Sequence, residues 1–290
     1  MKLIYKFNLV LLLVGSLGFA ATAAVSYEML VAKAHDESLQ NARLMLEAAL
    51  ATRNYTNTNI VHLLETQMKY EFLPESVPSF AATEAFRSLH KTMPDYGYKE
   101  ATLNPTNPRD RVTDWEADVV NRFREHPELA EISGERDTPS GRSLYLARPI
   151  TIKDPACIAC HDTAADAPRT LIDKYGSSNG FGWKLNETVA AQIVSVPAQV
   201  PADRARATFI TFIASVAAVF GVVFVALNAM LALLVVRPLN RLSSIAVRVS
   251  LGEADVPPFD AGGRDEIGML AGAFARMRTS LETALELIEQ

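Results

Sequence analysis

A run of 30 uncharged residues, Ala207 to Val236, constrains this 290-residue chain more than any other feature. At about 1.5 Å per residue, a helix of this length exceeds the hydrocarbon core of a bilayer, which is about 30 Å thick. A second uncharged run, Phe7 to Tyr27, has 21 residues and is also long enough to cross a membrane. Two spans divide the chain into five predicted parts: residues 1–6, span 7–27, residues 28–206, span 207–236 and residues 237–290.

The first run has a second interpretation, which is a cleaved signal peptide. Ala21-Thr22-Ala23 resembles a cleavage site that follows a short apolar region. The apolar pattern continues through Val25 and Met29 into a stretch of helix-forming residues. This continuation favours an uncleaved anchor.

The chain's only two cysteines lie in the sequence Cys157-Ile158-Ala159-Cys160-His161. The pattern C-x-x-C-H is typical of c-type haem attachment, because the thiols can add to the porphyrin vinyl groups while the imidazole binds the iron. We predict one haem c on Cys157 and Cys160, with His161 as the proximal iron ligand. A redox dithiol would not need the histidine. A zinc site would need two more ligands, and Asp162 is the only obvious one nearby.

The charges beside the spans predict the orientation of the chain. Lys2 and Lys6 precede the first span, and Arg237, Arg241 and Arg248 follow the second. Positive residues favour the cytoplasmic side, so both termini are expected in the cytoplasm and the intervening segment in the periplasm. Bacteria attach c-type haem outside the cytoplasmic membrane, so the haem motif predicts the same location. The expected place is therefore the bacterial inner membrane.

A long helix is predicted from Glu28 to about Met68, where the sequence has no glycine or proline. Six residues recur at spacings of three and four and form one stripe: Leu44, Ala48, Ala51, Tyr55, Thr58 and His62. Its small residues would leave room for a flat macrocycle, which makes His62 the candidate distal iron ligand. Alternative ligands are Met45, Met68 and Met93, whereas His35, His90 and His126 are interpreted as solvated.

The rest of the segment between the spans has mixed helical and strand patterns, which predicts an α+β fold. Helices are expected near residues 83–90 and 115–126, and strands near 144–152 and 189–196. A loop rich in glycine and aromatic residues, Tyr175 to Trp183, is long enough to fold over a flat ligand. Aromatic residues that merely anchor a turn are the alternative.

After the second span, two apolar seams follow heptad spacing. The first is Leu239, Leu242, Ala246 and Val249, and the second is Ile267, Leu270, Phe274, Met277, Leu281, Ala284 and Ile288. Gly252 to Gly263 is expected to connect the two helices without helical structure. Each helix leaves an apolar stripe, so pairing with a second copy in a four-helix bundle is predicted. Acidic Glu282, Glu286 and Glu289 disfavour the alternative of a helix lying on the membrane.

Residues 237 to 288 resemble the HAMP signalling linker of bacterial receptors. The resemblance is carried by Arg237-Pro238-Leu239, by Gly252 after the first helix, and by Arg264-Asp265-Glu266-Ile267-Gly268. It implies a parallel, dimeric, all-α coiled-coil domain that relays a change from outside the cytoplasmic membrane to an output module.

The segment from about residue 38 to 202 resembles the PAS-like, haem c-binding sensor domain that precedes HAMP in many bacterial receptors. Besides the haem motif, five stretches carry the resemblance: residues 53–56, 77–80, 103–108, 134–139 and 145–149. A sixth is Asn179-Gly180-Phe181-Gly182-Trp183. The resemblance implies a PAS-like extracytoplasmic sensor domain between the two spans.

The chain stops at Gln290 without a phosphate-binding loop, phosphoacceptor helix or cyclase motif. We therefore expect a receptor that is not an enzyme and that acts on a separate histidine kinase, chemotaxis or cyclase-type output protein. It would sense redox state if the iron has two strong ligands, or a diatomic gas if one site is open. A membrane-anchored electron carrier and a truncated receptor are the alternatives. The net charge of −5 gives no basic surplus for nucleic acid.

Overall fold

The computed structural model describes residues 3–139, 141–253, 255–259 and 265–289. The chain forms two compact units. One unit is Glu28–Thr208, and the other combines Met1–Tyr27 with Phe209–Gln290.

Two long helical segments contain the apolar runs. One consists of α1 (Leu3–Tyr55), a π-helical stretch η1 (Thr56–Ile60) and α2 (Val61–Met68). The other consists of α7 (Gln199–Leu231), a π-helical stretch η4 (Ala232–Val236) and α8 (Arg237–Ser250). Each contains a part that is long and apolar enough to cross a membrane, and little of that part is buried in the protein. The predicted long helix up to Met68 is confirmed, although its hydrogen bonding changes at Thr56.

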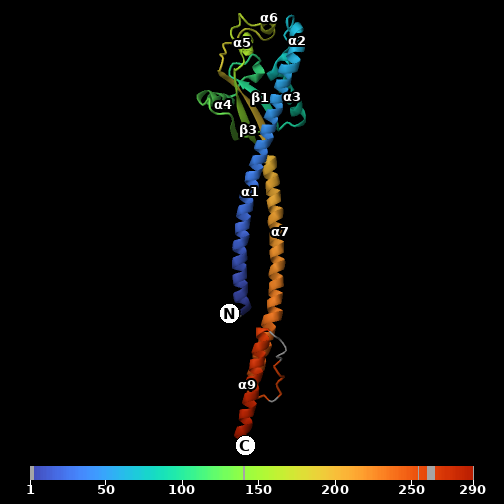
Figure 1. The fold of residues 1–290 in the computed structure, drawn as a ribbon, viewed down its shortest axis with the longest axis vertical. Helices are drawn as coiled ribbons and strands as arrows, with labels where there is room; N and C mark the ends of the chain where they lie inside the picture. The colour runs from blue at the N-terminus through green and yellow to red at the C-terminus, as the bar shows by residue number, and fades with distance from the viewer. Residues whose placement is uncertain (1–2, 140, 254, 260–264, 290) are drawn as a thin grey trace. The chain divides into compact units, whose positions relative to one another are not determined.

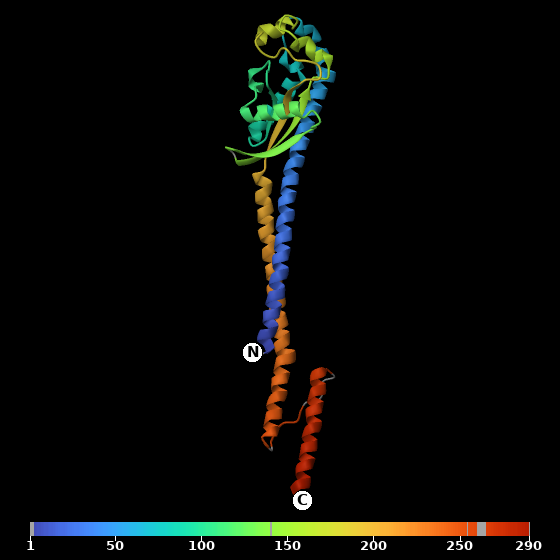
Figure 2. The ribbon, with the colours of Figure 1, turned by 90° about the vertical axis from the view of Figure 1, so that its left-hand side faces the viewer.

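Within the second unit, the first part of α1 and the apolar part of α7 lie side by side, as both views show (Figures 1 and 2). The rings of Tyr27 and Phe209 have centroids 5.6 Å apart. A Cβ atom at Gly15 would lie 1.8 Å from the ring of Phe220. Glycine at this position therefore permits the close approach of the two helices.

The unit Glu28–Thr208 is built on one antiparallel sheet. Its strands are β1 (Gly97–Thr102), β2 (Ile132–Thr138), β3 (Gly141–Thr151) and β4 (Thr188–Pro197), in the spatial order β1-β4-β3-β2. Strands β3 and β4 confirm the two that the sequence predicts. Strands β1 and β2 were not predicted, because each mixes charged residues with glycine and lacks a β-branched run.

Alternate residues of the sheet face two different helices. On one face, Ala42 and Leu46 of α1 pack against Leu144, Leu146 and Val194. The other face is covered by the predicted helix α4 (Asp114–Glu125), which begins with a capping box of Thr113 and Glu116. Figure 1 shows α1 and α4 on opposite sides of the strands. The core thus consists of two apolar layers, one on each side of the sheet.

The predicted stripe on α1, η1 and α2 faces away from the sheet. All six of its residues are exposed, with Leu44 at 69% and Tyr55 at 59%. The buried side carries Ala42, Leu46, Ala49 and Thr56, which recur at similar spacings. Helical periodicity identifies faces, but it does not tell which of two faces meets the sheet.

The remaining helices lie between these elements. Helix α3 (Pro78–Thr92) includes the predicted residues 83–90 and is longer, because Pro78 suits the first turn of a helix. Short 3₁₀ turns are η2 (Pro74–Ser76) and η3 (Pro108–Asp110). Two further short helices are α5 (Pro155–His161), which contains the cysteine motif, and α6 (Arg169–Tyr175).

The last part of the chain forms two helices, α8 and α9 (Glu266–Glu289), packed through one apolar cluster. The cluster contains Leu242, Ile245, Val256, Phe259 and Ala271. Gly252 has a φ of +77° and follows the end of α8, as predicted. Met277 and Leu281 of the second seam remain about half exposed. Part of the predicted connector, residues 254 and 260–263, and the side chains of Glu286, Ile288 and Glu289 lie outside the described portion of the protein.

Candidate functional site

Helix α5 presents the cysteine motif at one end of the sheet. Its N-terminus is fixed because the Asp154 carboxylate accepts a hydrogen bond from the backbone N–H of Ala156 at 2.9 Å. Pro155 occupies the first turn, where a helix does not need its N–H. Cys157 and Cys160 are three residues apart and therefore lie on neighbouring positions of one helical face.

The two cysteine side chains reach into different apolar clusters. Cys157 packs with Ile152, Val189 and Ala190. Cys160 packs in a cluster that contains Phe72, Met68 of α2 and Leu171 of α6. Both thiols are free and half-buried. Burial raises the pKa of Cys157 and of Cys160, and a nearby acidic Asp154 adds to the rise at Cys157. A reactive dithiol needs a lowered pKa, so this environment disfavours that alternative.

His161 is held in one tautomer by the backbone. Its Nδ1 lies 2.7 Å from the carbonyl oxygen of Gly180, which can only accept a hydrogen bond, so Nδ1 carries the hydrogen. Burial lowers the pKa of His161, although the bond to Gly180 acts in the opposite direction. The imidazole is therefore neutral at neutral pH and keeps a lone pair on Nε2, the form in which histidine binds metals.

The glycine-aromatic loop lies behind His161 and supports it. The imidazole stacks on Trp183, with ring centroids 3.9 Å apart and planes 12° from parallel. The backbone N–H of Trp183 donates to the carbonyl of His161 at 3.1 Å, and that of Gly182 donates to Asp162 at 2.7 Å. Gly182 and Trp183 of this loop thus fix the position of the His161 backbone and ring.

Asn104 connects this loop to the segment after β1. Its amide nitrogen donates to the carbonyl of Phe181 at 3.1 Å, and its amide oxygen accepts from the N–H of Gly180 at 3.2 Å. Gly180 has a φ of +87°, and a Cβ atom there would lie 2.0 Å from Thr106 Oγ1. No local sequence pattern predicts these roles for Asn104 and Gly180, although both residues lie in stretches that carry the family resemblance.

These side chains fit the predicted attachment of a c-type haem. Two free thiols are placed three residues apart, the adjacent imidazole leaves Nε2 for iron, and both cysteines border apolar side chains. The zinc alternative has less support. Within the ranges that the structure describes, no group of three His, Cys, Asp or Glu side chains could hold a metal ion.

Comparison with known proteins agrees with the two resemblances. Residues 31–197 match the model of the Tll0287-like family, whose description is Tll0287. This match covers more than half of the chain. The chain belongs to the Tll0287-like family. Residues 224–283 match the HAMP domain. A solved structure, titled "Crystal structure of the cyanobacterial heme-protein Tll0287", matches with 17% identity and a TM-score of 0.41, over 56% of this chain and 95% of its own. No curated protein matches the chain.

This Tll0287-like domain leaves the candidate distal ligand His62 exposed. The side chain of His62 is 70% exposed on α2, and its Nδ1 lies 2.9 Å from the Glu65 carboxylate. The structure therefore does not bring His62 against the two cysteines, and its role as a ligand stays a prediction. His35 and His126 are also about half exposed, each beside a glutamate, and exposed His90 bonds to the Tyr96 carbonyl.

The three candidate methionines have different surroundings in the same domain. Met68 packs in the cluster that contains Cys160, and its sulfur accepts a hydrogen bond from Ser76 at 3.0 Å. Met45 packs against the sheet with Leu46, and Met93 is half exposed. Of these three, Met68 is the one that shares a cluster with a cysteine of the motif.

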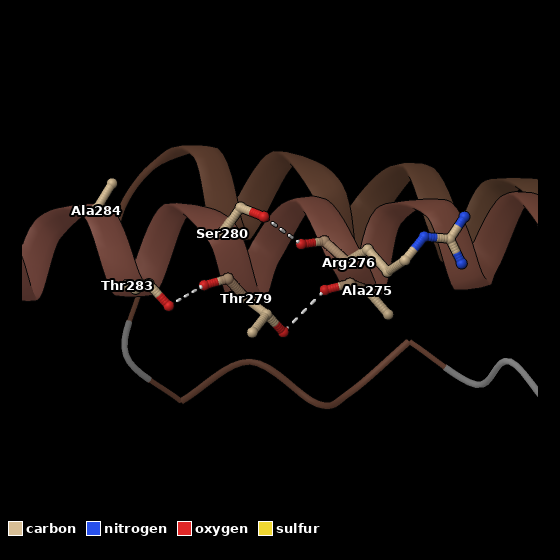
Figure 3. A pocket seen from close by; sticks show the side chains of 6 residues that line it. All are labelled: Ala275, Arg276, Thr279, Ser280, Thr283 and Ala284. Carbon is tan, nitrogen blue, oxygen red and sulfur yellow. Dashed lines mark hydrogen bonds between the residues drawn. The ribbon is translucent and has the colours of Figure 1, made fainter.

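A shallow hollow on α9 has no comparable chemistry. It is lined by Ala275, Arg276, Thr279, Ser280, Thr283 and Ala284 (Figure 3). Its three hydroxyl groups donate to backbone carbonyls of the same helix, at 2.9 to 3.2 Å. Those three hydroxyl donors are used within the helix, so Arg276 is the lining residue that presents a charged group and the other side chains are small.

Proposed function

We propose that this chain is an inner-membrane receptor with a single c-type haem, bound covalently through Cys157 and Cys160. His161 is the proximal iron ligand. The bound haem supplies an iron that can change its oxidation state or bind a diatomic gas. The observation that carries the proposal is the bond from His161 Nδ1 to the Gly180 carbonyl, which leaves Nε2 available beside the two thiols.

In this proposal, residues 28–206 lie in the periplasm and both termini lie in the cytoplasm. The two candidate membrane helices and the HAMP match support this arrangement. A periplasmic location also meets the requirement for haem attachment.

The signal passes from the sensor domain through the second span to the HAMP domain of a homodimer, and from there to a separate output protein. Membership of the Tll0287-like family, together with the HAMP match, supports a sensor joined to a signalling linker. The half-exposed seam residues Met277 and Leu281 support pairing with a second copy. The receptor itself is proposed to have no enzymatic activity.

Mass spectrometry of the full-length protein, made in cells that mature c-type cytochromes, tests the cofactor assignment. We expect one haem per chain, retained under denaturing conditions. Replacing both cysteines by alanine should remove the adduct, while Asp162→Asn, a nearby change outside the motif, should keep it. A wild-type polypeptide without the adduct would contradict the proposal.

A further inference from the structure

A partly buried ion pair connects α1 to strand β1. The guanidinium of Arg53 donates through Nη1 to the Glu100 carboxylate, and Glu100 is 4% exposed. The other carboxylate oxygen accepts from the Tyr98 hydroxyl at 2.7 Å, and Gln192 donates to that hydroxyl at 3.0 Å. Burial raises the pKa of Tyr98, as does the Glu100 charge, so the hydroxyl remains a donor.

The strand register places this ion pair next to the cysteine motif. Glu100 pairs with Gln192 of β4, and two residues further along β4 Ala190 pairs with Ile150. Ala190 and Ile150 both belong to the cluster around Cys157. Residues in a strand are about 3.4 Å apart, so the Glu100 row is roughly 7 Å from the row that packs against Cys157.

The charge of Arg53 acts at the attachment cysteine. Although burial raises the pKa of Cys157, the Arg53 charge opposes this rise. Arginine remains protonated in proteins, so Glu100 is what neutralises this cation. Charges that are partly buried in a protein interact more strongly than charges in bulk water, because the effective dielectric constant is lower.

The helix changes its hydrogen-bonding pattern directly after Arg53. Regular α1 ends at Tyr55, and the π-helical stretch η1 follows at Thr56. Short π-helical segments often mark functional sites within helices. Arg53 therefore lies on the helix that continues from the first span, next to a place where its geometry is irregular.

We propose that Arg53 and Glu100 couple the charge of the haem iron to helix α1 and set the iron's reduction potential. The inference rests on the proposed attachment of haem to Cys157. When one electron from a one-electron donor reduces iron(III) to iron(II), the haem loses one positive charge. The repulsion between Arg53 and the haem is then weaker, so the balance between this repulsion and the attraction of Arg53 to Glu100 changes. The electrostatic force on α1 changes with it.

Spectroelectrochemical titration of the full-length, haem-loaded protein tests the coupling. Glu100→Gln leaves the Arg53 cation uncompensated, which favours the reduced iron. We expect about a tenfold increase in the equilibrium constant for reduction, which is 59 mV for a one-electron couple. The double variant Arg53→Gln with Glu100→Gln replaces a neutral pair by another neutral pair, so its potential should return toward the wild-type value.

Glu131→Gln is the matched control, because it removes the carboxylate that Arg43 of the same helix contacts at 2.6 Å. This change should leave the potential within a twofold change in the equilibrium constant. Hydrogen exchange of the oxidised and reduced protein adds a second readout. Reduction should change exchange across residues 50–60 in the wild type, and the double variant should lose that difference.

The outcomes separate this inference from the proposed function. A polypeptide without attached haem would contradict both. A normal adduct with an unchanged potential in Glu100→Gln would overturn the coupling while the haem assignment stands. If Glu100→Gln does not fold, the double variant provides the test. A difference in hydrogen exchange between its oxidised and reduced forms that equals the wild-type difference would overturn the coupling.

Discussion

The Nδ1 atom of His161 lies 2.7 Å from the carbonyl oxygen of Gly180, a residue that is 19 positions away in the sequence. This contact fixes the tautomer of the imidazole, and Trp183 fixes the orientation of its plane. The position of Gly180 depends in turn on Asn104. The cysteine motif therefore has a support that is assembled from two distant loops.

Gly180→Ala should destabilise the loop that supports His161. Its positive φ costs about 1–3 kcal/mol for a residue with a side chain, and the Cβ would also meet Thr106 at 2.0 Å. Gly182→Ala is the matched control, since Gly182 has a φ of +80° but no atom within 4 Å of the added Cβ. Thermal unfolding and the haem absorption spectrum measure the effects. Equal effects of the two changes would contradict a specific role for the Thr106 contact.

Asn104→Ala should loosen the same support without changing the backbone preference. It removes two hydrogen bonds, each worth about 0.5–1.5 kcal/mol, that join Asn104 to Gly180 and Phe181. We expect altered EPR parameters of the oxidised haem, because the imidazole is no longer held in one orientation. Asn107→Ala is a control in the same segment, since its side chain bonds to the local N–H of Arg109. Identical EPR spectra for wild type and Asn104→Ala would refute this role.

Much of this architecture can be predicted from local sequence patterns. The remaining parts are determined by contacts between residues that are distant in the sequence. The apolar runs, strand β3 and the motif at Cys157 are visible locally because each uses a pattern of neighbouring residues. Strand β1 is hidden, because Lys99 pairs with Glu116 of α4 and Glu100 pairs with Arg53 of α1. These charges are stable in a sheet only when their partners are present.

The distal ligand illustrates a second limit of the sequence. Spacing alone groups His62 with small residues, but the whole stripe faces away from the sheet. Met68 packs with Cys160 because the turn after α2 brings Phe72 against α6. Contacts with the sheet determine which face of the helix is buried, and helical periodicity carries no information about those contacts.

Met68→Leu should change the absorption and EPR spectra more than His62→Ala does. Met68 shares a cluster with Cys160, whereas His62 is exposed and would have to leave Glu65 to reach an iron. Leucine keeps the volume of Met68 and removes the sulfur, so the fold should be little affected. Met93→Leu serves as the control at a half-exposed position. Unchanged spectra for Met68→Leu would remove this sulfur from the axial position.

The stability of the protein should depend on pH through Asp110. Burial raises the pKa of Asp110 from 3.8 to about 6, although nearby Arg109 opposes the rise. Between these pH values the folded state holds a proton that the unfolded chain has lost, so this group's contribution to stability falls as pH rises. Asp110→Asn should be more stable than wild type by up to about 3 kcal/mol at pH 8, with little gain at pH 4, because one pKa unit corresponds to about 1.36 kcal/mol. Unfolding measured at both pH values checks this, and exposed Asp95→Asn should track the wild type.

Leu281→Glu should disrupt the proposed homodimer without changing the haem site. The side chain of Leu281 is 49% exposed on the second seam of α9, where a second copy would cover it. A charge in a buried seam is costly to desolvate, so a shift from dimer to monomer is expected. Ser280→Glu, one position away, places the same charge beside the seam and should leave the dimer intact. Light scattering of the detergent-solubilised protein measures the mass, and the absorption spectrum reports the haem.

A Leu281→Glu protein that stays dimeric would contradict the bundle, because Leu281 would then not be covered by a second copy. Loss of the dimer with an unaltered spectrum would show that the seam holds the two copies together without changing the haem site.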